Sequence, residues 1–219
     1  YVGAPAGGIW KSTDAGVTYI PLTDDLPQIG VSGIAIDPNN SNIIYIATGD
    51  DDAGDSYSVG IWKSTNGGLS WTPTGINPSN SPNRTSEIYI NPNNSSMLWV
   101  ATSSGVYKTT NAGNNWTLTQ SGNFRDLKVN PTNPNIIYAS TSSQFYRSTD
   151  SGNSFTQISS GLPVDSGRLF MDVTQANSNY VYLVSATSNY GYQGIYRSSP
   201  VIRKLIFYTK EISLDLLYL

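Results

Sequence analysis

The sequence predicts an all-β fold, namely a fragment of a β-propeller built from four-stranded antiparallel blades. Two short motifs that alternate along the chain predict this fold, and the composition agrees with them. Of the 219 residues, 11% are aromatic and 12% are charged, and there are 20 Gly and 12 Pro. Aromatic and β-branched residues favour strands, whereas Gly, Pro, Asn and Asp favour tight turns.

The first motif joins a short strand to a turn and is first seen at residues 8–16 (GIWKSTDAG). It recurs at residues 60–68, 105–113 and 144–152, and a fifth copy begins at Gly194 and stops matching at Pro200. In each full copy an aromatic residue follows the final glycine three positions later; these residues are Tyr19, Trp71, Trp116 and Phe155. The motif therefore predicts the third strand of a repeat, a turn, and a fourth strand that starts at the aromatic residue.

The second motif pairs two apolar runs, as in residues 34–38 (IAIDP) followed by residues 43–47 (IIYIA). It supplies the first and second strands of each repeat, so that every 40 to 50 residues contain about four strands, as in a propeller blade. We expect blades at residues 31–83, 84–122 and 123–166, with partial blades at 1–30 and 167–199. Four to eight blades usually close a propeller, so we expect the remaining blades of a parent propeller to complete this one.

The turn of the first motif has a simple physical explanation. Its Asp or Asn side chain accepts hydrogen bonds from turn N–H groups, and its glycine adopts a positive φ angle at little cost. The residues concerned are Asp14, Asn66, Asn111 and Asp150, with Gly16, Gly68, Gly113 and Gly152. Asp and Asn exchange between copies, which favours a structural role over a catalytic one.

This Ser/Thr-x-Asp/Asn-x-Gly-x-x-aromatic pattern resembles the Asp-box, or BNR, repeat over residues 8–199. The repeat occurs in sialidases, xyloglucanase-like glycosidases, sortilin-type (VPS10) receptors and photosystem II assembly factors. The resemblance implies that the Asp-box turns lie on the propeller face opposite the active site. We therefore expect a functional site among the loops that follow second strands and precede first strands.

An acidic loop at residues 49–58 is the first candidate for such a site. Its carboxylates are candidate ligand-binding groups, together with a tyrosine; these residues are Asp51, Asp52, Asp55 and Tyr57. Asp50, Asp52 and Asp55 are candidate calcium ligands, because Ca²⁺ prefers oxygen donors, although the spacing does not match an EF-hand loop. The alternative is a solvated acidic loop. Asp50 is also a candidate catalytic residue, since xyloglucanase-like enzymes carry a catalytic Asp after the second strand of a blade.

Tyrosines and arginines provide the other candidates. Tyr190 and Tyr192 lie in the loop after the second strand of the last repeat, where they would bind a sugar or protein, or pack locally. Arg84, Arg125 and Arg168 each lie just before an expected first strand, so they are candidates to line the central channel. Sialidases bind a substrate carboxylate with three arginines from different blades; the alternative is that these arginines keep loops soluble.

Several function classes are excluded or disfavoured. A net charge of −3 and a pI near 4.7 disfavour nucleic-acid binding. The chain has no Cys and no His, which excludes disulfides, thiolate metal sites and His-based catalysis. Residues 200–219 do not fit the repeats and are too polar to span a membrane. We expect them to be an aberrant, frameshifted coding end, or else a genuine terminal strand.

The expected function is that of an extracellular, glycosidase-like bacterial propeller that binds or hydrolyses polysaccharide. If it is an enzyme, it is expected to be a glycoside hydrolase of the xyloglucanase-like or sialidase-like kind. No cofactor is expected other than calcium. The alternatives are a protein-binding propeller, resembling sortilin or an assembly factor, and a structural module of a large secreted protein, because a propeller fold alone does not decide function.

Overall fold

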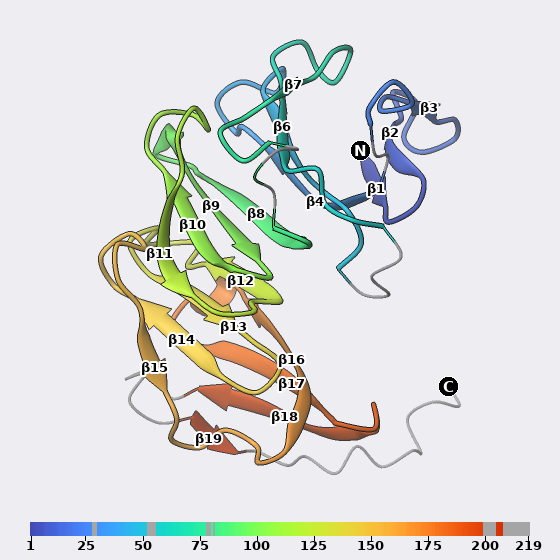
Figure 1. The fold of residues 1–219 in the computed structure, drawn as a ribbon. Helices are drawn as coiled ribbons and strands as arrows, with labels where there is room; N and C mark the ends of the chain where they lie inside the picture. The colour runs from blue at the N-terminus through green and yellow to red at the C-terminus, as the bar shows by residue number, and fades with distance from the viewer. Residues whose placement is uncertain (28–29, 52–55, 78–79, 81, 199–204, 208–219) are drawn as a thin grey trace.

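The computed structural model describes residues 1–27, 30–51, 56–77, 80, 82–198 and 205–207, the last segment as backbone only. The described residues form five antiparallel sheets, which follow one another in chain order along an open arc (Figure 1). Each sheet is built from consecutive strands, so each is a blade in the sense predicted from the repeats. We number them blades 1 to 5.

Blade 1 has three strands, and blades 2 to 5 have four each. The strands of blades 1 and 2 are β1 (Val2–Ala4), β2 (Gly8–Lys11), β3 (Ile20–Pro21), β4 (Val31–Ile36), β5 (Ile44–Thr48), β6 (Ile61–Ser64) and β7 (Thr72–Pro73). Those of blades 3 and 4 are β8 (Thr85–Asn91), β9 (Asn94–Thr102), β10 (Gly105–Thr109), β11 (Thr117–Ser121), β12 (Asp126–Val129), β13 (Ile137–Ser140), β14 (Phe145–Ser148) and β15 (Thr156–Ile158). Blade 5 contains β16 (Ser166–Val173), β17 (Val181–Thr187), β18 (Tyr192–Ser198) and β19 (Leu205–Phe207), with a short 3₁₀ helix at Gln175–Asn177.

The strands differ from the expected ones in three details. The fourth strand of each of blades 1 to 4 starts one residue after the aromatic rather than at it, for example at Thr72 after Trp71. The segment Val2–Ala4 pairs with β2 as an additional strand of blade 1. Leu205–Phe207, within the segment that breaks the repeat pattern, pairs with β18 as the fourth strand of blade 5. The coding origin of residues 200–219 stays a prediction that only resequencing tests.

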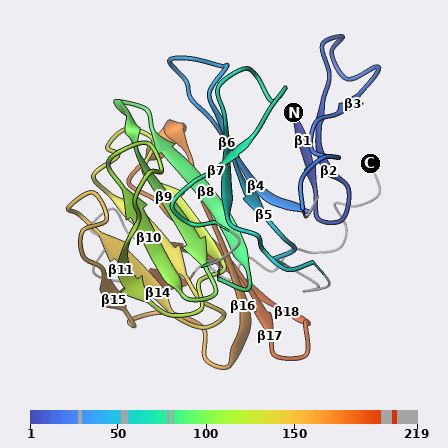
Figure 2. The same cartoon turned by 45° about the horizontal axis from the view of Figure 1, so that its top comes forward.

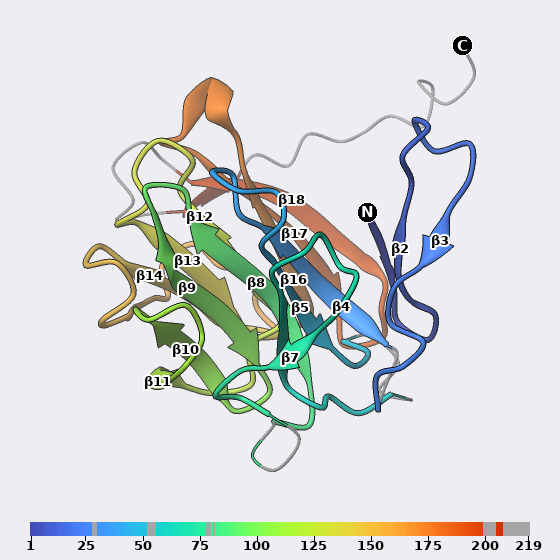
Figure 3. The same ribbon diagram turned by 90° about the horizontal axis from the view of Figure 1, so that it is seen from above.

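The hydrophobic core lies between blades rather than within them. One cluster joins Tyr45 and Ile61 of blade 2 to Ile88 and Leu98 of blade 3. Equivalent clusters join blades 3 and 4, and blades 4 and 5. The first strands β4, β8, β12 and β16 also pack against one another in series, so they form the inner side of the arc (Figures 1 and 3). Blade 1 lies at the far end of the arc from blade 5 (Figures 1 and 2).

The four Asp-box turns join third strands to fourth strands, so they share one end of the blades, which we call the turn end. In blade 4, Asp150 Oδ1 accepts hydrogen bonds from the backbone N–H groups of Asn153 and Ser154, both at 3.0 Å. The N–H group of Gly152, whose φ is 74°, donates to Ser148 Oγ at 2.8 Å. The other three turns repeat this arrangement; their Asp or Asn residues are Asp14, Asn66 and Asn111, and their positive-φ glycines are Gly16, Gly68 and Gly113.

A hydrogen bond from an aromatic side chain joins each of three turns to the preceding blade. Tyr45 Oη donates to the carbonyl of Ala112 at 3.1 Å, and Trp99 Nε1 donates to that of Ser151 at 2.9 Å. Tyr1 Oη donates to Gly67 in the same way at 3.0 Å. The accepting residue has a positive φ angle in every case, 57° for Ala112, 59° for Ser151 and 70° for Gly67. The turns therefore hold neighbouring blades together as well as closing hairpins.

Candidate functional site

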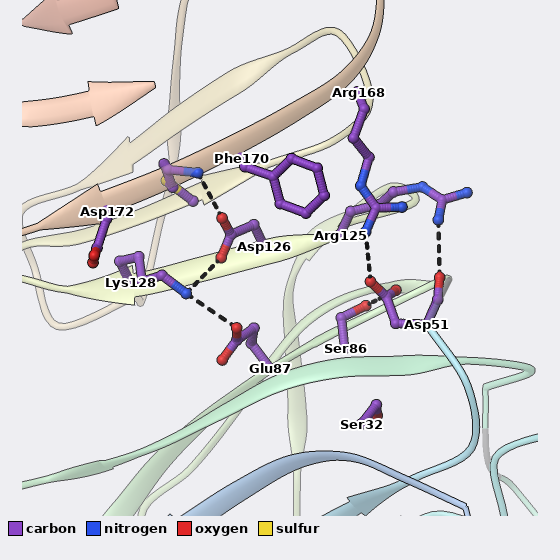
Figure 4. Close-up of a pocket in the computed structure, with 11 residues that line it drawn as sticks. Ser32, Asp51, Ser86, Glu87, Arg125, Asp126, Lys128, Arg168, Phe170 and Asp172 are labelled. Atoms are coloured by element: carbon purple, nitrogen blue, oxygen red, sulfur yellow. Dashed lines mark hydrogen bonds and ion pairs between the residues drawn. The ribbon is translucent and has the colours of Figure 1, made fainter. Parts of the chain in front are cut away.

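A pocket of about 320 Å³ opens on the inner side of the arc, at the end of the blades opposite the Asp-box turns. First strands of four blades line it, together with the loop that follows β5 (Figure 4). Its lining includes Asp51, Ser86, Glu87, Arg125, Asp126, Lys128, Arg168, Phe170 and Asp172. We call this end of the blades the pocket end.

Three arginines from three blades converge on Asp51. Arg84 Nε lies 2.9 Å from Asp51 Oδ1, and Arg168 Nη2 lies 3.0 Å from Asp51 Oδ2. Arg125 Nη1 donates to the backbone carbonyl of Asp51 at 3.0 Å, and Ser86 Oγ donates to Oδ1 at 2.5 Å. The acidic loop of blade 2 is thereby attached to blades 3, 4 and 5 (Figure 4).

These ionic contacts are largely removed from solvent. The side chains of Arg84, Arg168 and Asp51 are only 17%, 13% and 18% exposed. The guanidinium group of Arg168 lies over the ring of Phe170, 4.5 Å from the ring centroid, and Arg84 also donates to Asn123 Oδ1. Arginines that only solubilised loops would project into water, so the structure assigns these three to the rim of the pocket.

A second ionic cluster lies deeper in the pocket and is centred on Lys128. Its ammonium lies 2.9 Å from Asp126 Oδ1 and 3.0 Å from Glu87 Oε1. The ion pair with Glu87 joins blade 4 to blade 3. Asp126 Oδ2 also accepts a hydrogen bond from the backbone N–H of Met171 in blade 5, at 2.7 Å. Both Asp126 oxygens thus contact protein donors.

Burial and charge shift the protonation equilibria of this cluster. Burial raises the pKa of Glu87, and the ammonium of Lys128 opposes that rise only in part. Burial disfavours the charged form of Lys128, but the carboxylates of Asp126 and Glu87 raise its pKa further than burial lowers it. The cluster therefore keeps a charged lysine in a partly desolvated place.

The other predicted residues are divided between buried and exposed positions. Asp50 is 4% exposed and does not line the pocket, and its backbone N–H donates to the carbonyl of Ser56. Tyr57, Tyr190 and Tyr192 are exposed, in loops or at a strand start between second and third strands, which places them at the pocket end. Asp52 and Asp55 lie outside the described residues. Within the described part, no group of three or more acidic residues is arranged to hold a metal ion.

Sequence reasoning missed the lysine cluster together with Phe170 and Asp172. A usable signal was present, because Lys128 and Asp172 each interrupt the apolar residues of a first strand. A charged residue within an innermost strand has only the central channel in which to keep its charge hydrated. Lys128 and Asp172 pair with equivalent tyrosines of β13 and β17, Tyr138 and Tyr182.

The charges of the site nearly compensate one another. Two arginines contact the carboxylate of Asp51 and a third contacts its backbone carbonyl. One lysine bridges two carboxylates, and Asp172 adds a further exposed carboxylate. Such a surface offers many hydrogen-bonding groups together with an aromatic ring but has little net charge. It is suited to a polar ligand that carries no charge. No helix in the described part of the chain is long and apolar enough to cross a membrane.

The fold is similar to that of known propellers in solved structures. A GH74 enzyme from Niastella koreensis superposes with a TM-score of 0.68 at 24% identity, over 93% of this chain and 34% of that chain. The GH74 xyloglucanase from Xanthomonas campestris gives 0.69 at 15% identity, over 93% and 35%. YCF48 from Cyanidioschyzon merolae gives 0.56 at 13% identity, over 84% and 57%.

No family model and no curated protein matches the sequence. The chain spans about a third of the length of the GH74 structures that it resembles. Together with the open arc of five sheets, these similarities show that the chain has the fold of a β-propeller fragment.

Proposed function

We propose that this chain is part of an extracellular propeller that binds polysaccharide at its pocket end. The observation that carries the proposal is the pocket on the inner strands, whose lining combines charge-compensated polar groups with the ring of Phe170. Sugar hydroxyls exchange hydrogen bonds with such groups, and sugar faces stack on aromatic rings. The similarity to GH74 enzymes supports the same ligand class.

Exposed tyrosines extend this surface beyond the pocket. Tyr57 of blade 2 and Tyr190 and Tyr192 of blade 5 lie at the pocket end, and Tyr190 is 87% exposed. Large exposed aromatic side chains are favourable anchors for a ligand, because they lose little conformational entropy on binding. A polysaccharide chain is long enough to contact both the pocket and such outlying rings.

Binding rather than hydrolysis is the activity that we assign to this fragment. Glycoside hydrolysis requires a pair of carboxyl groups beside the scissile bond. In the described pocket, Asp51 is engaged by arginines, and Glu87 and Asp126 are engaged by Lys128. Asp50 stays the candidate catalytic residue, and its partner would come from blades outside this chain.

The test is retention of the parent protein on immobilised polysaccharides, with Tyr192→Ala and Tyr57→Ala as variants. Both substitutions are expected to weaken binding by about tenfold, a typical loss for an aromatic anchor. Leu69→Ala is the matched control, because Leu69 is equally exposed but lies in an Asp-box turn at the opposite end. Equal retention of all three variants and the wild type would exclude the tyrosines of the pocket end as binding residues. If the wild type is not retained, a protein partner is favoured.

A further inference from the structure

We propose that Asp51 is a resident anion that determines the specificity of the pocket. Its carboxylate occupies an arginine-lined site that would otherwise accept the carboxylate or sulfate group of an acidic glycan. The pocket is thereby restricted to uncharged sugars. The part of the inference that concerns sugars rests on the proposed function, whereas the occupied anion site does not.

Three donors from blades 3 and 5 surround the Asp51 carboxylate. Arg84 contacts one oxygen at 2.9 Å, Arg168 contacts the other at 3.0 Å, and Ser86 adds a hydroxyl donor at 2.5 Å. Two guanidinium groups and a hydroxyl around one carboxylate form the kind of site with which proteins bind oxyanions. A third guanidinium, that of Arg125, holds the backbone carbonyl of the same residue.

Contacts other than those with Asp51 also hold these arginines in place. Arg168 lies against the ring of Phe170, and Arg84 donates to Asn123. Cation–π contacts and side-chain hydrogen bonds of this kind fix guanidinium groups in the absence of an anion. Removal of the Asp51 carboxylate would therefore leave an ordered cationic site with its desolvation cost uncompensated.

The other cations among the described residues that line the pocket are already engaged, and Arg125 donates to the backbone carbonyl of Asp51. Lys128 already contacts Asp126 and Glu87, and the remaining exposed charge is the carboxylate of Asp172. A ligand carboxylate would have to displace Asp51 or face carboxylates without compensation. An uncharged sugar meets neither penalty, which makes Asp51 the residue that separates the two ligand classes.

Anion-dependent thermal stability of Asp51→Ala and Asp51→Asn tests the occupied site directly. Inorganic sulfate, added at constant ionic strength, is expected to raise the Tm of both variants saturably and to leave that of the wild type unchanged. Asp172→Ala is the matched control, because Asp172 is a carboxylate of the same pocket but is not the one that contacts Arg84 and Arg168. Sulfate should leave the Tm of this variant unchanged. A variant that is unfolded without sulfate should fold in its presence. Failure of sulfate to stabilise or fold the Asp51 variants overturns the inference.

Retention on polygalacturonate and on a neutral polysaccharide tests the specificity. Asp51→Ala should bind polygalacturonate at least about tenfold more strongly than the wild type, and Asp51→Ala combined with Arg168→Ala should lose that gain. Unchanged polygalacturonate binding alongside a sulfate response would reject Asp51 as the specificity determinant. A wild type that retains no polysaccharide, with a sulfate response in Asp51→Ala, would reject the proposed function but not the occupied anion site.

Discussion

At the scale of single residues, an Asp and an Asn perform the same task in the Asp-box turns. Asp150 Oδ1 and Asn111 Oδ1 each accept a hydrogen bond from the backbone N–H four residues later, at 3.0 and 2.9 Å. A carboxylate has one further acceptor, and Asp150 Oδ2 uses it to accept the hydroxyl of Ser154 at 2.6 Å. The bond from this hydroxyl is the largest contribution that lowers the pKa of Asp150, to about 2.

Substitution of Asp150 separates these acceptor roles. Asp150→Ala removes both carboxylate acceptors and is expected to lower the free energy of unfolding by about 1 kcal/mol, a modest value because the carboxylate is exposed. Asp150→Asn retains one acceptor, now an amide oxygen, and should lower the free energy of unfolding by less than half as much. Chemical denaturation of both variants measures the difference, and an equal loss from Asn and Ala would show that the negative charge itself stabilises the turn.

The lowered pKa of Asp150 also fixes the direction of a pH effect. Because the pKa falls from 3.8 to about 2 on folding, the stabilisation is complete above pH 3.8 and is lost as the pH falls through 2. Asp150→Asn should remove this part of the acid sensitivity. Titration of the Asp150 carboxyl carbon by NMR gives the pKa directly, and a midpoint near 3.8 would contradict the turn geometry.

At the scale of elements, hydrogen bonds from second-strand aromatics to Asp-box turns connect neighbouring blades. The hydroxyl of Tyr45 is an example, since it reaches the carbonyl of Ala112 in the next blade. Burial raises the pKa of Tyr45 to about 12, in agreement with a hydroxyl held away from water. A buried carbonyl that loses its donor pays a desolvation cost, so these contacts should influence stability more than exposed hydrogen bonds do.

Tyr45→Phe is therefore expected to lower the free energy of unfolding by about 1 to 2 kcal/mol. The matched control is Tyr182→Phe, because Tyr182 holds the equivalent strand position in blade 5 but its side chain is exposed. The control should change stability by no more than about 0.5 kcal/mol. Equal effects from the two substitutions, measured by urea denaturation, would show that the contact between blades carries no stability of its own.

At the scale of the whole molecule, the last blade leaves one face uncovered. Val184 and Ile195 lie side by side on β17 and β18, and their exposed fractions are 41% and 38%. In blades 2 to 4 the equivalent positions of the second and third strands, such as Ala47 and Ile61, are fully buried against the next blade. This face is therefore built to receive a further blade, as expected for a chain that spans a third of the GH74 structures.

When the 219-residue chain is produced alone, the uncovered face is expected to cause self-association. Val184→Lys together with Ile195→Lys should shift the chain toward monomer in sedimentation velocity experiments. Val17→Lys is the control, because Val17 is highly exposed but lies in an Asp-box turn. Association that persists in the double variant would place the contact elsewhere, and a longer chain that covers the face should not associate at all.

The fold was predictable because the motifs repeat in register. Each repeat encodes one sheet of consecutive strands, so local pattern alone predicts the pairing of β4 through β7 or β8 through β11. The short strand Val2–Ala4 was missed because residues 1–7 do not contain a complete second motif. Leu205–Phe207 was difficult to place because its composition differs from that of the repeats.

The candidate site was predictable only in part, because it is assembled from several blades. The positions of Arg84, Arg125 and Arg168 near the starts of first strands made a shared rim one of two interpretations, the other being arginines that keep loops soluble. Nothing in the spacing shows that all three reach Asp51, since that depends on the angle between blades and on the path of a loop. The cluster around Lys128 was missed for the same reason. One of its carboxylates, Glu87, belongs to another blade, and the other, Asp126, lies two residues before Lys128 on the same strand.

The hydrogen bond from a second-strand aromatic to the following turn has an evolutionary consequence. The donor and the acceptor are both encoded within every full repeat, so a duplicated repeat carries both halves of the joint that it needs. Gene duplication or loss of whole repeats would therefore change the circumference of the ring without requiring a new contact to evolve. Blade number can vary among descendants of one ancestral repeat, while the joint itself, as between Trp99 and Ser151, stays the same.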